Sequence, residues 1–283
     1  MKRPQLVLTA IGIVLLIGLY VGGNTVPPHP KESQSENTAE QKEIDIHDIF
    51  QPFKAKLTPA QLAYVNRLEN SVVRGDIKNQ ELAAYKELAS FWRDSVQNSF
   101  LPAAYYTAQA AKLENSEKNL NFAAQLFLNG LRSQDNPEMK NWMAKQAKEL
   151  FESVLQMNPG NDSAKVGLGA SYIFGSAAGN PQEVMQGIQQ ILEVARKDSN
   201  NMYAQFMLGL GGIESGQFDK AIVRLTKVVV HQPDNIEAIL NLAEAYEREG
   251  NKPQAIKWYS AGRKLSNNQE LIKAIDQRIK LLQ

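Results

Sequence analysis

The stretch that decides the fold runs from residue 202 to residue 269. In it, MYAQFMLGLGGIESGQFDKAIVRLTKVVVHQPDN (202–235) is followed by IEAILNLAEAYEREGNKPQAIKWYSAGRKLSNNQ (236–269). Small or apolar residues recur 34 positions apart, as in the pairs Leu208 and Leu242, Gly216 and Gly250, and Ala221 and Ala255. A fixed period of this length is typical of a helix–turn–helix unit that buries its apolar face only by stacking on copies of itself. The period therefore predicts a helical solenoid.

The repeating residues resemble the tetratricopeptide repeat family. The first helix of that family's repeat carries apolar, small and aromatic residues at positions 7, 8 and 11. The residues at these positions are Leu242, Ala243 and Tyr246 in 236–269, Leu208, Gly209 and Gly212 in 202–235, and Leu168, Gly169 and Tyr172 in 162–201. The unit 162–201 is longer because its turn around Gly175–Pro181 is longer. The resemblance implies an all-α, right-handed solenoid over 162–269, with weaker matches upstream.

Capping signals predict where several helices begin, most of them upstream of the three clear repeats. Thr58-Pro59-Ala60-Gln61 combines an N-cap, a proline at the first helical position and a capping-box glutamine. We expect helices over 59–73, 78–95, 102–114 and 118–132, and two others that Asn136-Pro137 and Asn180-Pro181 start. Residues 57–161 are thus interpreted as degenerate helical repeats. Residues 270–283 are expected to form a capping helix with one polar side.

The N-terminal residues predict a membrane anchor. After the short N-terminus (1–4), residues 5–23 contain no charged residue and are mostly Leu, Ile, Val and Gly. The apolar run from Leu6 to Gly23 has 18 residues, and a helix of that length would reach about 27 Å, close to the thickness of a hydrocarbon core. Lys2 and Arg3 favour a cytoplasmic N-terminus, which places the repeats on the periplasmic or extracellular side of an inner membrane. The alternative is a cleaved signal peptide, which places the repeats on the same side.

Residues 24–56 are expected to form a disordered or extended tether. Residues 24–43 are rich in Pro, Ser, Glu, Asn and Gln. A flexible chain of about 20 residues, the length of 24–43, would have a root-mean-square reach of about 25 Å. The segment from Ile44 to Phe53 carries enough apolar residues to dock on the repeats. One possible docking place is the peptide-binding groove that the resemblance to the tetratricopeptide repeat family implies.

In the tetratricopeptide repeat family, positions 2, 5, 6, 9, 12 and 13 of the first helices line a groove that holds peptides. The resemblance implies a partner-binding groove formed by Val166, Ala170, Ile173, Phe174, Tyr203, Phe206, Met207, Leu210, Ile213, Leu240, Asn241 and Glu244. Chaperone-binding members hold a C-terminal carboxylate with Lys at position 5 and Asn at position 9. These positions here are Val166 and Ala170, Phe206 and Leu210, and Leu240 and Glu244, so that carboxylate clamp is absent.

The implied groove is apolar in its middle and acidic at one end. An exposed apolar patch of this kind is typical of an interaction site, and it suits an amphipathic helix or an apolar peptide. The alternative is a groove already filled, either by the chain's own 44–57 segment or by a second copy in a homo-oligomer. Both possibilities remain open at the level of sequence.

Composition argues against several other classes of function. The 283 residues include 31 Lys and Arg against 30 Asp and Glu, so no basic field favours nucleic acid. Cysteine is absent, and His29, His47 and His231 lack the spacing of a metal site. The glycines at 209, 211, 212 and 216 lack the Gly-Lys-Ser/Thr ending of a phosphate loop and fit close helix packing instead. We expect no catalysis, cofactor or metal.

The sequence thus predicts a membrane-tethered scaffold or adaptor that binds a protein or peptide. By analogy with membrane-tethered bacterial proteins of this layout, a chaperone-like role in the assembly or maturation of exported proteins, such as cytochrome c biogenesis, is one form it could take. The alternative is a structural subunit of a cell-envelope complex, with a constitutive or self-associating interface.

Overall fold

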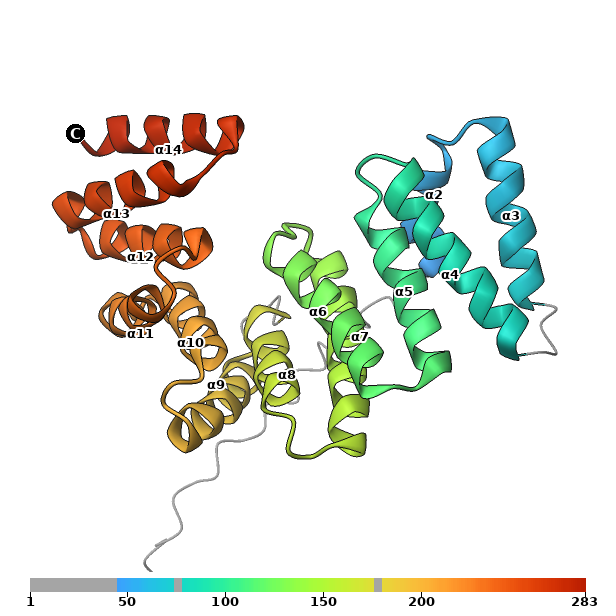
Figure 1. The fold of residues 1–283 in the computed structure, drawn as a ribbon, viewed down its shortest axis with the longest axis horizontal. Coiled ribbons are helices and arrows are strands. Elements are labelled where there is room, and N and C mark those ends of the chain that lie inside the picture. The colour runs from blue at the N-terminus through green and yellow to red at the C-terminus, as the bar shows by residue number, and fades with distance from the viewer. Residues whose placement is uncertain (1–44, 74–77, 176–179) are drawn as a thin grey trace, which may run out of the picture. The chain divides into compact units, whose positions relative to one another are not determined.

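The computed structural model describes residues 45–73, 78–175 and 180–283, and every regular element in these residues is a helix. The helices, drawn in Figure 1, are α2 (Ile46–Lys54), α3 (Pro59–Val73), α4 (Lys78–Ser95), α5 (Phe100–Glu114), α6 (Glu117–Arg132), α7 (Pro137–Met157), α8 (Asp162–Gly175), α9 (Pro181–Lys197), α10 (Met202–Glu214), α11 (Phe218–His231), α12 (Ile236–Glu249), α13 (Lys252–Leu265) and α14 (Gln269–Leu282). The prediction of an all-α fold is confirmed for this part of the chain.

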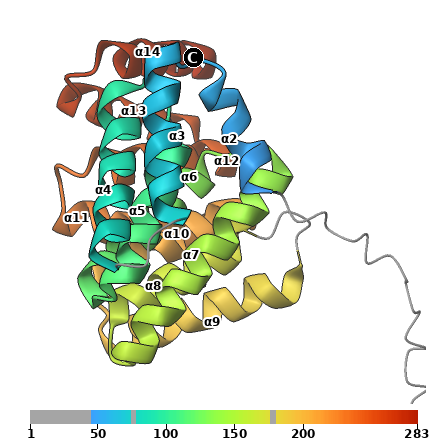
Figure 2. The same ribbon diagram turned by 90° about the vertical axis from the view of Figure 1, so that its right-hand side faces the viewer.

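The helices pack as consecutive pairs. α4 packs on α5, α6 on α7, α8 on α9, α10 on α11, and α12 on α13. The first helix of a pair also contacts the first helix of the next, as α6 does α8 and α8 does α10. Figures 1 and 2 show α3 and α4 side by side, and Figure 1 shows α12, α13 and α14 in successive layers. This nearest-neighbour stacking is the arrangement of a solenoid.

Side-chain caps explain where many helices begin. The Thr58 hydroxyl accepts from the backbone N–H of Gln61, and the Gln61 side chain accepts from that of Thr58, so the predicted capping box is present. The predicted caps Asn136 and Asn180 also accept from backbone N–H groups. The side chains of Asn201 and Asn235, which are 34 residues apart in the sequence, accept such bonds at the start of α10 and of α12. Each cap satisfies an N–H that the helix itself leaves unpaired.

Glycines allow close contact between paired helices, as the sequence predicted. A Cβ atom on Gly209 would lie 2.7 Å from Leu225, and one on Gly212 would lie 3.1 Å from the Cβ of Ala221. Gly212 stands where the family usually has an aromatic residue, and it faces Ala221 of α11 with no room for a larger side chain. The interpretation as packing residues is confirmed for Gly209 and Gly212 and is wrong for Gly216, which has a φ of +71°, lies in the turn after α10 and has no neighbouring atom within 4 Å.

The predicted membrane anchor (5–23) and most of the predicted tether (24–56) lie outside the described residues. Within the described ranges, no helix has both the length and the apolar character needed to cross a bilayer. The structure differs from an extended tether at its end, because residues 46–54 form α2. The side chains of α2 pack against α3, α4 and α5 rather than along α8 and α10.

Candidate interaction grooves

Most residues of the predicted groove are buried inside the protein's own core. The buried ones, none more than 8% exposed, are Val166, Ala170, Ile173, Phe174, Phe206, Met207, Leu210 and Ile213. All of them belong to one apolar cluster that also contains residues of α6 and α7. These side chains therefore hold neighbouring helices together, and this arrangement differs from the open groove expected along α8 and α10.

Helix α6 covers that middle section. The Tyr203 hydroxyl donates to the Gln125 side-chain oxygen at 3.1 Å, which joins α10 to α6, and burial raises the pKa of Tyr203 to about 12. The Arg132 guanidinium lies 5.7 Å from the ring centre of Phe206 and 2.8 Å from a carboxylate oxygen of Glu237. It also lies 6.0 Å from the ring centre of Phe174. Arg132 thus connects α6 to α8, α10 and α12, beyond the nearest-neighbour contacts of an ordinary solenoid.

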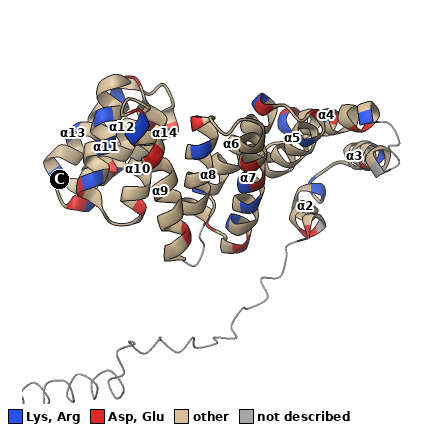
Figure 3. Ribbon diagram, turned by 90° about the horizontal axis from the view of Figure 1, so that it is seen from below, with Lys and Arg blue, Asp and Glu red and all other residues tan. Residues whose placement is uncertain are grey.

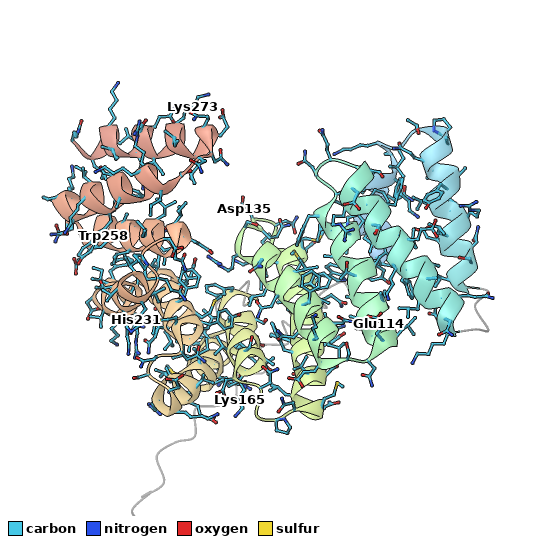
Figure 4. The ribbon with its side chains drawn as sticks, in the orientation of Figure 1. Glu114, Asp135, Lys165, His231, Trp258 and Lys273 are labelled. Atoms are coloured by element: carbon cyan, nitrogen blue, oxygen red, sulfur yellow. The ribbon has the colours of Figure 1, made fainter. Side chains whose placement is uncertain are left out.

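An open groove lies on the N-terminal side of this closed section. We call it the α4–α6 groove, a cavity of about 390 Å³. It is lined by Lys86, Ala89, Ser90 and Arg93 of α4, by Thr107, Ala110, Ala111 and Glu114 of α5, and by Asn119 and Phe122 of α6. The three alanines are buried and give an apolar floor, whereas Phe122 at the edge is 57% exposed. Figure 4 labels Glu114 on α5.

The polar side chains of the α4–α6 groove already have partners. Lys86 forms an ion pair with Glu114, whose carboxylate also accepts from the Asn119 amide. The hydrogen bond from Lys86 is the main cause that lowers the pKa of Glu114. On α4, Arg93 donates to the Ser90 hydroxyl at 3.2 Å. An apolar floor with a satisfied polar rim is the usual anatomy of a protein-binding site.

A second open groove lies at the C-terminal end. This α12–α14 groove, about 220 Å³, is lined by Leu240, Asn241, Glu244, Tyr259, Leu271, Ala274, Ile275 and Arg278. It brings together the three predicted groove residues of α12, which are half-buried.

A charged network stands at one side of the α12–α14 groove. The Tyr259 hydroxyl and Arg278 both donate to Glu247, at 2.9 and 2.8 Å. Burial and the bond to Glu247 raise the pKa of Tyr259 above its ordinary value. The Asn241 amide donates to the backbone oxygen of Glu237 at 2.8 Å, so the Asn241 side chain already has a hydrogen-bond partner within α12.

Sequence reasoning missed the α4–α6 groove although a signal was present. Leu88, Ala89 and Trp92 of α4 have the apolar, small and aromatic pattern of the repeat, as do Ala123, Ala124 and Phe127 of α6. That register places Lys86, Ser90 and Arg93 at positions 5, 9 and 12 and Phe122 at position 6, all of them groove positions.

Charged side chains and possible metal ligands are spread over the helices of the described ranges. Lys and Arg are interspersed with Asp and Glu along the helices (Figure 3). In the same ranges, no three His, Asp or Glu side chains gather as a metal site would require.

Comparisons with known proteins bear on the family and the fold. Residues 213–279 match a family model described as tetratricopeptide repeat. The solved structure of the tetratricopeptide repeat protein TTC0263 of Thermus thermophilus is 16% identical over 71% of this chain and 98% of its own, with a TM-score of 0.53. No match was found among curated proteins.

Two further solved structures have lower TM-scores. YrrB, described as a tetratricopeptide repeat protein with an unusual peptide-binding site, is 15% identical over 74% of this chain and 97% of its own, with a TM-score of 0.41. MamA of Desulfovibrio magneticus is 19% identical over 69% and 98%, with a TM-score of 0.42. The match to residues 213–279 and the fold shared with TTC0263 together support the tetratricopeptide repeat family for the repeats of this chain.

Proposed function

We propose that this protein is a non-catalytic scaffold or adaptor that binds an apolar segment of a protein partner in the α4–α6 groove. The observation that carries the proposal is Phe122, a large aromatic side chain that is 57% exposed beside a floor of buried alanines. Exposed aromatic residues at the edge of a concave apolar surface are typical of sites that exclude water on binding. The tetratricopeptide repeat fold is itself a protein-binding scaffold.

The groove chemistry favours an apolar ligand over a charged tail. Its floor consists of the small side chains of Ala89, Ala110 and Ala111, which leave room for a side chain of the partner. The Lys86–Glu114 ion pair neutralises the charge beside that floor. A carboxylate ligand would have to compete with Glu114 for Lys86, whereas an apolar side chain leaves the pair intact.

We propose that residues 5–23 anchor the protein in the inner membrane and that the repeats face the periplasm or the extracellular side. The support is the uncharged apolar run and the position of Lys2 and Arg3 before it. A chaperone-like role for exported proteins fits this location. Retention in the membrane after alkaline extraction, with repeats open to protease from the outer side, is the expected result. Release by alkali, or protection of the repeats in spheroplasts whose inner membrane is intact, would contradict it.

Photo-crosslinking in intact cells tests the binding site. A photoreactive phenylalanine analogue at Phe122 should capture a discrete partner. The matched control is the same analogue at Leu281, which is 75% exposed and outside both grooves. Ala110→Phe should abolish capture from position 122, because the larger ring fills the floor. Equal adducts from both positions, or capture that persists in Ala110→Phe, would refute the proposal.

A further inference from the structure

Helix α2 sits on the protein as a bound amphipathic helix would. Its apolar side chains Ile46, Ile49, Phe50 and Phe53 fall at positions i, i+3, i+4 and i+7 and therefore share one face. Ile49 and Phe50 are 4% exposed, and the other two are partly buried. Anchors with this spacing are those of a helix that binds in a groove of another protein.

The surface that receives α2 is rich in aromatic residues. We call it the α2 groove, and its buried residues are Val65 and Leu68 of α3, Leu88, Ala89 and Trp92 of α4, and Tyr106 of α5. The Phe50 ring centre lies 5.3 Å from that of Tyr105, edge to face, and 5.6 Å from that of Tyr106. Aromatic pairs in such geometry add specificity beyond simple burial.

A polar contact fixes the direction in which α2 lies. The Lys54 ammonium, one residue after the last apolar anchor, is 2.7 Å from a carboxylate oxygen of Glu69. The Tyr106 hydroxyl donates to the other oxygen of Glu69 at 2.5 Å. The Lys54 ammonium and the Glu69 carboxylate are both largely shielded from water. The surface therefore favours a helix with a cation at the position of Lys54 over one with a neutral residue there.

Three features separate α2 from the helices that it contacts. α2 has nine residues with Pro52 inside, and a helix of that length is not stable without its docking surface. Residues 55–58 alone connect it to α3. α3 packs directly on α4, and α4 on α5, so these contacts do not depend on α2.

We propose that the α2 groove is a receptor for an amphipathic helix of a protein partner, which α2 occupies until that helix displaces it. The partner helix carries large apolar residues at i, i+3, i+4 and i+7 and a lysine or arginine at i+8, which pairs with Glu69. Different residues of α4 and α5 line the α4–α6 groove, apart from Ala89, so this site can exist whether or not that groove binds a partner.

A synthetic peptide of residues 44–57 with a fluorescent label is the probe. It is added to the full chain, either wild type or with Ile49→Ala and Phe50→Ala, which weaken the docking of the internal helix. The double variant should bind the peptide at least about tenfold more tightly than the wild type, because the groove is no longer occupied. A peptide with the same two substitutions should not bind. Added to the double variant, Glu69→Gln should weaken binding of the unsubstituted peptide several-fold, whereas Glu193→Gln, on α9, should not.

Hydrogen exchange of the wild-type chain gives a second readout. Saturating peptide should increase exchange in α2 and leave α4 protected. Peptide binding without increased exchange in α2 would place the site elsewhere and overturn the proposal. Loss of protection across α3, α4 and α5 in the double variant would overturn it as well, since α2 would then be an integral layer of the fold. A wild-type dimer that dissociates in the double variant would assign the groove to a second copy instead of a partner.

Discussion

Gly169 offers the sharpest test of how α8 and α9 pack. A Cβ atom on Gly169 would lie 2.6 Å from the backbone oxygen of Gly187 and 2.7 Å from the Ile191 side chain. Real Cβ atoms essentially never approach another heavy atom within 3.0 Å. Since the first obstacle is backbone, a rotamer change cannot relieve it, and the two helices would have to separate. We therefore predict that Gly169→Ala destabilises the protein.

The magnitude follows from two opposing effects. Alanine is favoured over glycine inside a helix by about 1 kcal/mol. Overpacking of a close contact costs about 1–3 kcal/mol, and a backbone obstacle puts this case near the upper end. The matched control is Gly211→Ala, where the nearest atoms are Ile173 methyl groups at 3.5 and 3.6 Å, an ordinary contact. The control should keep the helix gain, so the two variants should differ by about 2–3 kcal/mol in unfolding free energy.

Urea unfolding followed by far-ultraviolet circular dichroism measures that difference. Equal m values in both variants would show that the same structure unfolds, a necessary check in a repeat protein whose units can unfold separately. If Gly169→Ala unfolds at the same urea concentration as Gly211→Ala, or at a higher one, the proposed backbone contact does not limit the packing of α8 on α9.

Three further predictions concern other contacts. A double-mutant cycle of Arg132→Gln and Glu237→Gln should give a coupling of about 0.5–1 kcal/mol in unfolding free energy, since the pair is partly exposed; a value near zero would remove the ion pair as a tie between α6 and α12. Asn235→Ala should lower the unfolding free energy by about 1 kcal/mol through loss of the cap on Ala238, and Asn235→Ser should restore most of it; equal stability of the alanine and serine variants would exclude the cap. Burial raises the pKa of Tyr203 to about 12, above the value near 10 of an unfolded chain, so its contribution is complete below pH 10 and is lost as the pH rises towards 12. Tyr203→Phe should therefore flatten the alkaline fall in stability, and an unchanged slope would argue against a buried hydroxyl.

Local features of the fold could be predicted from sequence because they depend on neighbouring residues. The helices expected at 59–73 and 78–95 are α3 and α4 with the same bounds. The capping box at Thr58 and the packing role of Gly209 were also visible, since each depends on a short motif or on the repeat register. Helix α2 was not predicted, since its residues were expected to belong to a disordered or extended tether; its helical form depends on a docking surface contributed by residues far along the chain.

The state of the groove could not be predicted from register alone. The repeat places residues on a face, but whether that face meets solvent depends on contacts such as Tyr203 with Gln125, which are 78 positions apart. One sequence signal did bear on it: residues 162–175 and 202–214 are apolar nearly all round. A helix without a polar face is typically buried. The apolar groove residues of α8 and α10 therefore indicated core rather than an exposed binding surface.

The side of the repeats that carries the groove positions is open where the residues at those positions are polar. α4 carries Lys86, Ser90 and Arg93 there and α12 carries Asn241 and Glu244, and each set lines a groove. The section between them is closed by contacts from α6 to α8, α10 and α12. A short segment bound in one groove therefore cannot continue along the face into the other unless α6 moves. Substitutions in the two grooves should then affect binding independently, and coupling between them would be evidence that α6 shifts when a partner binds.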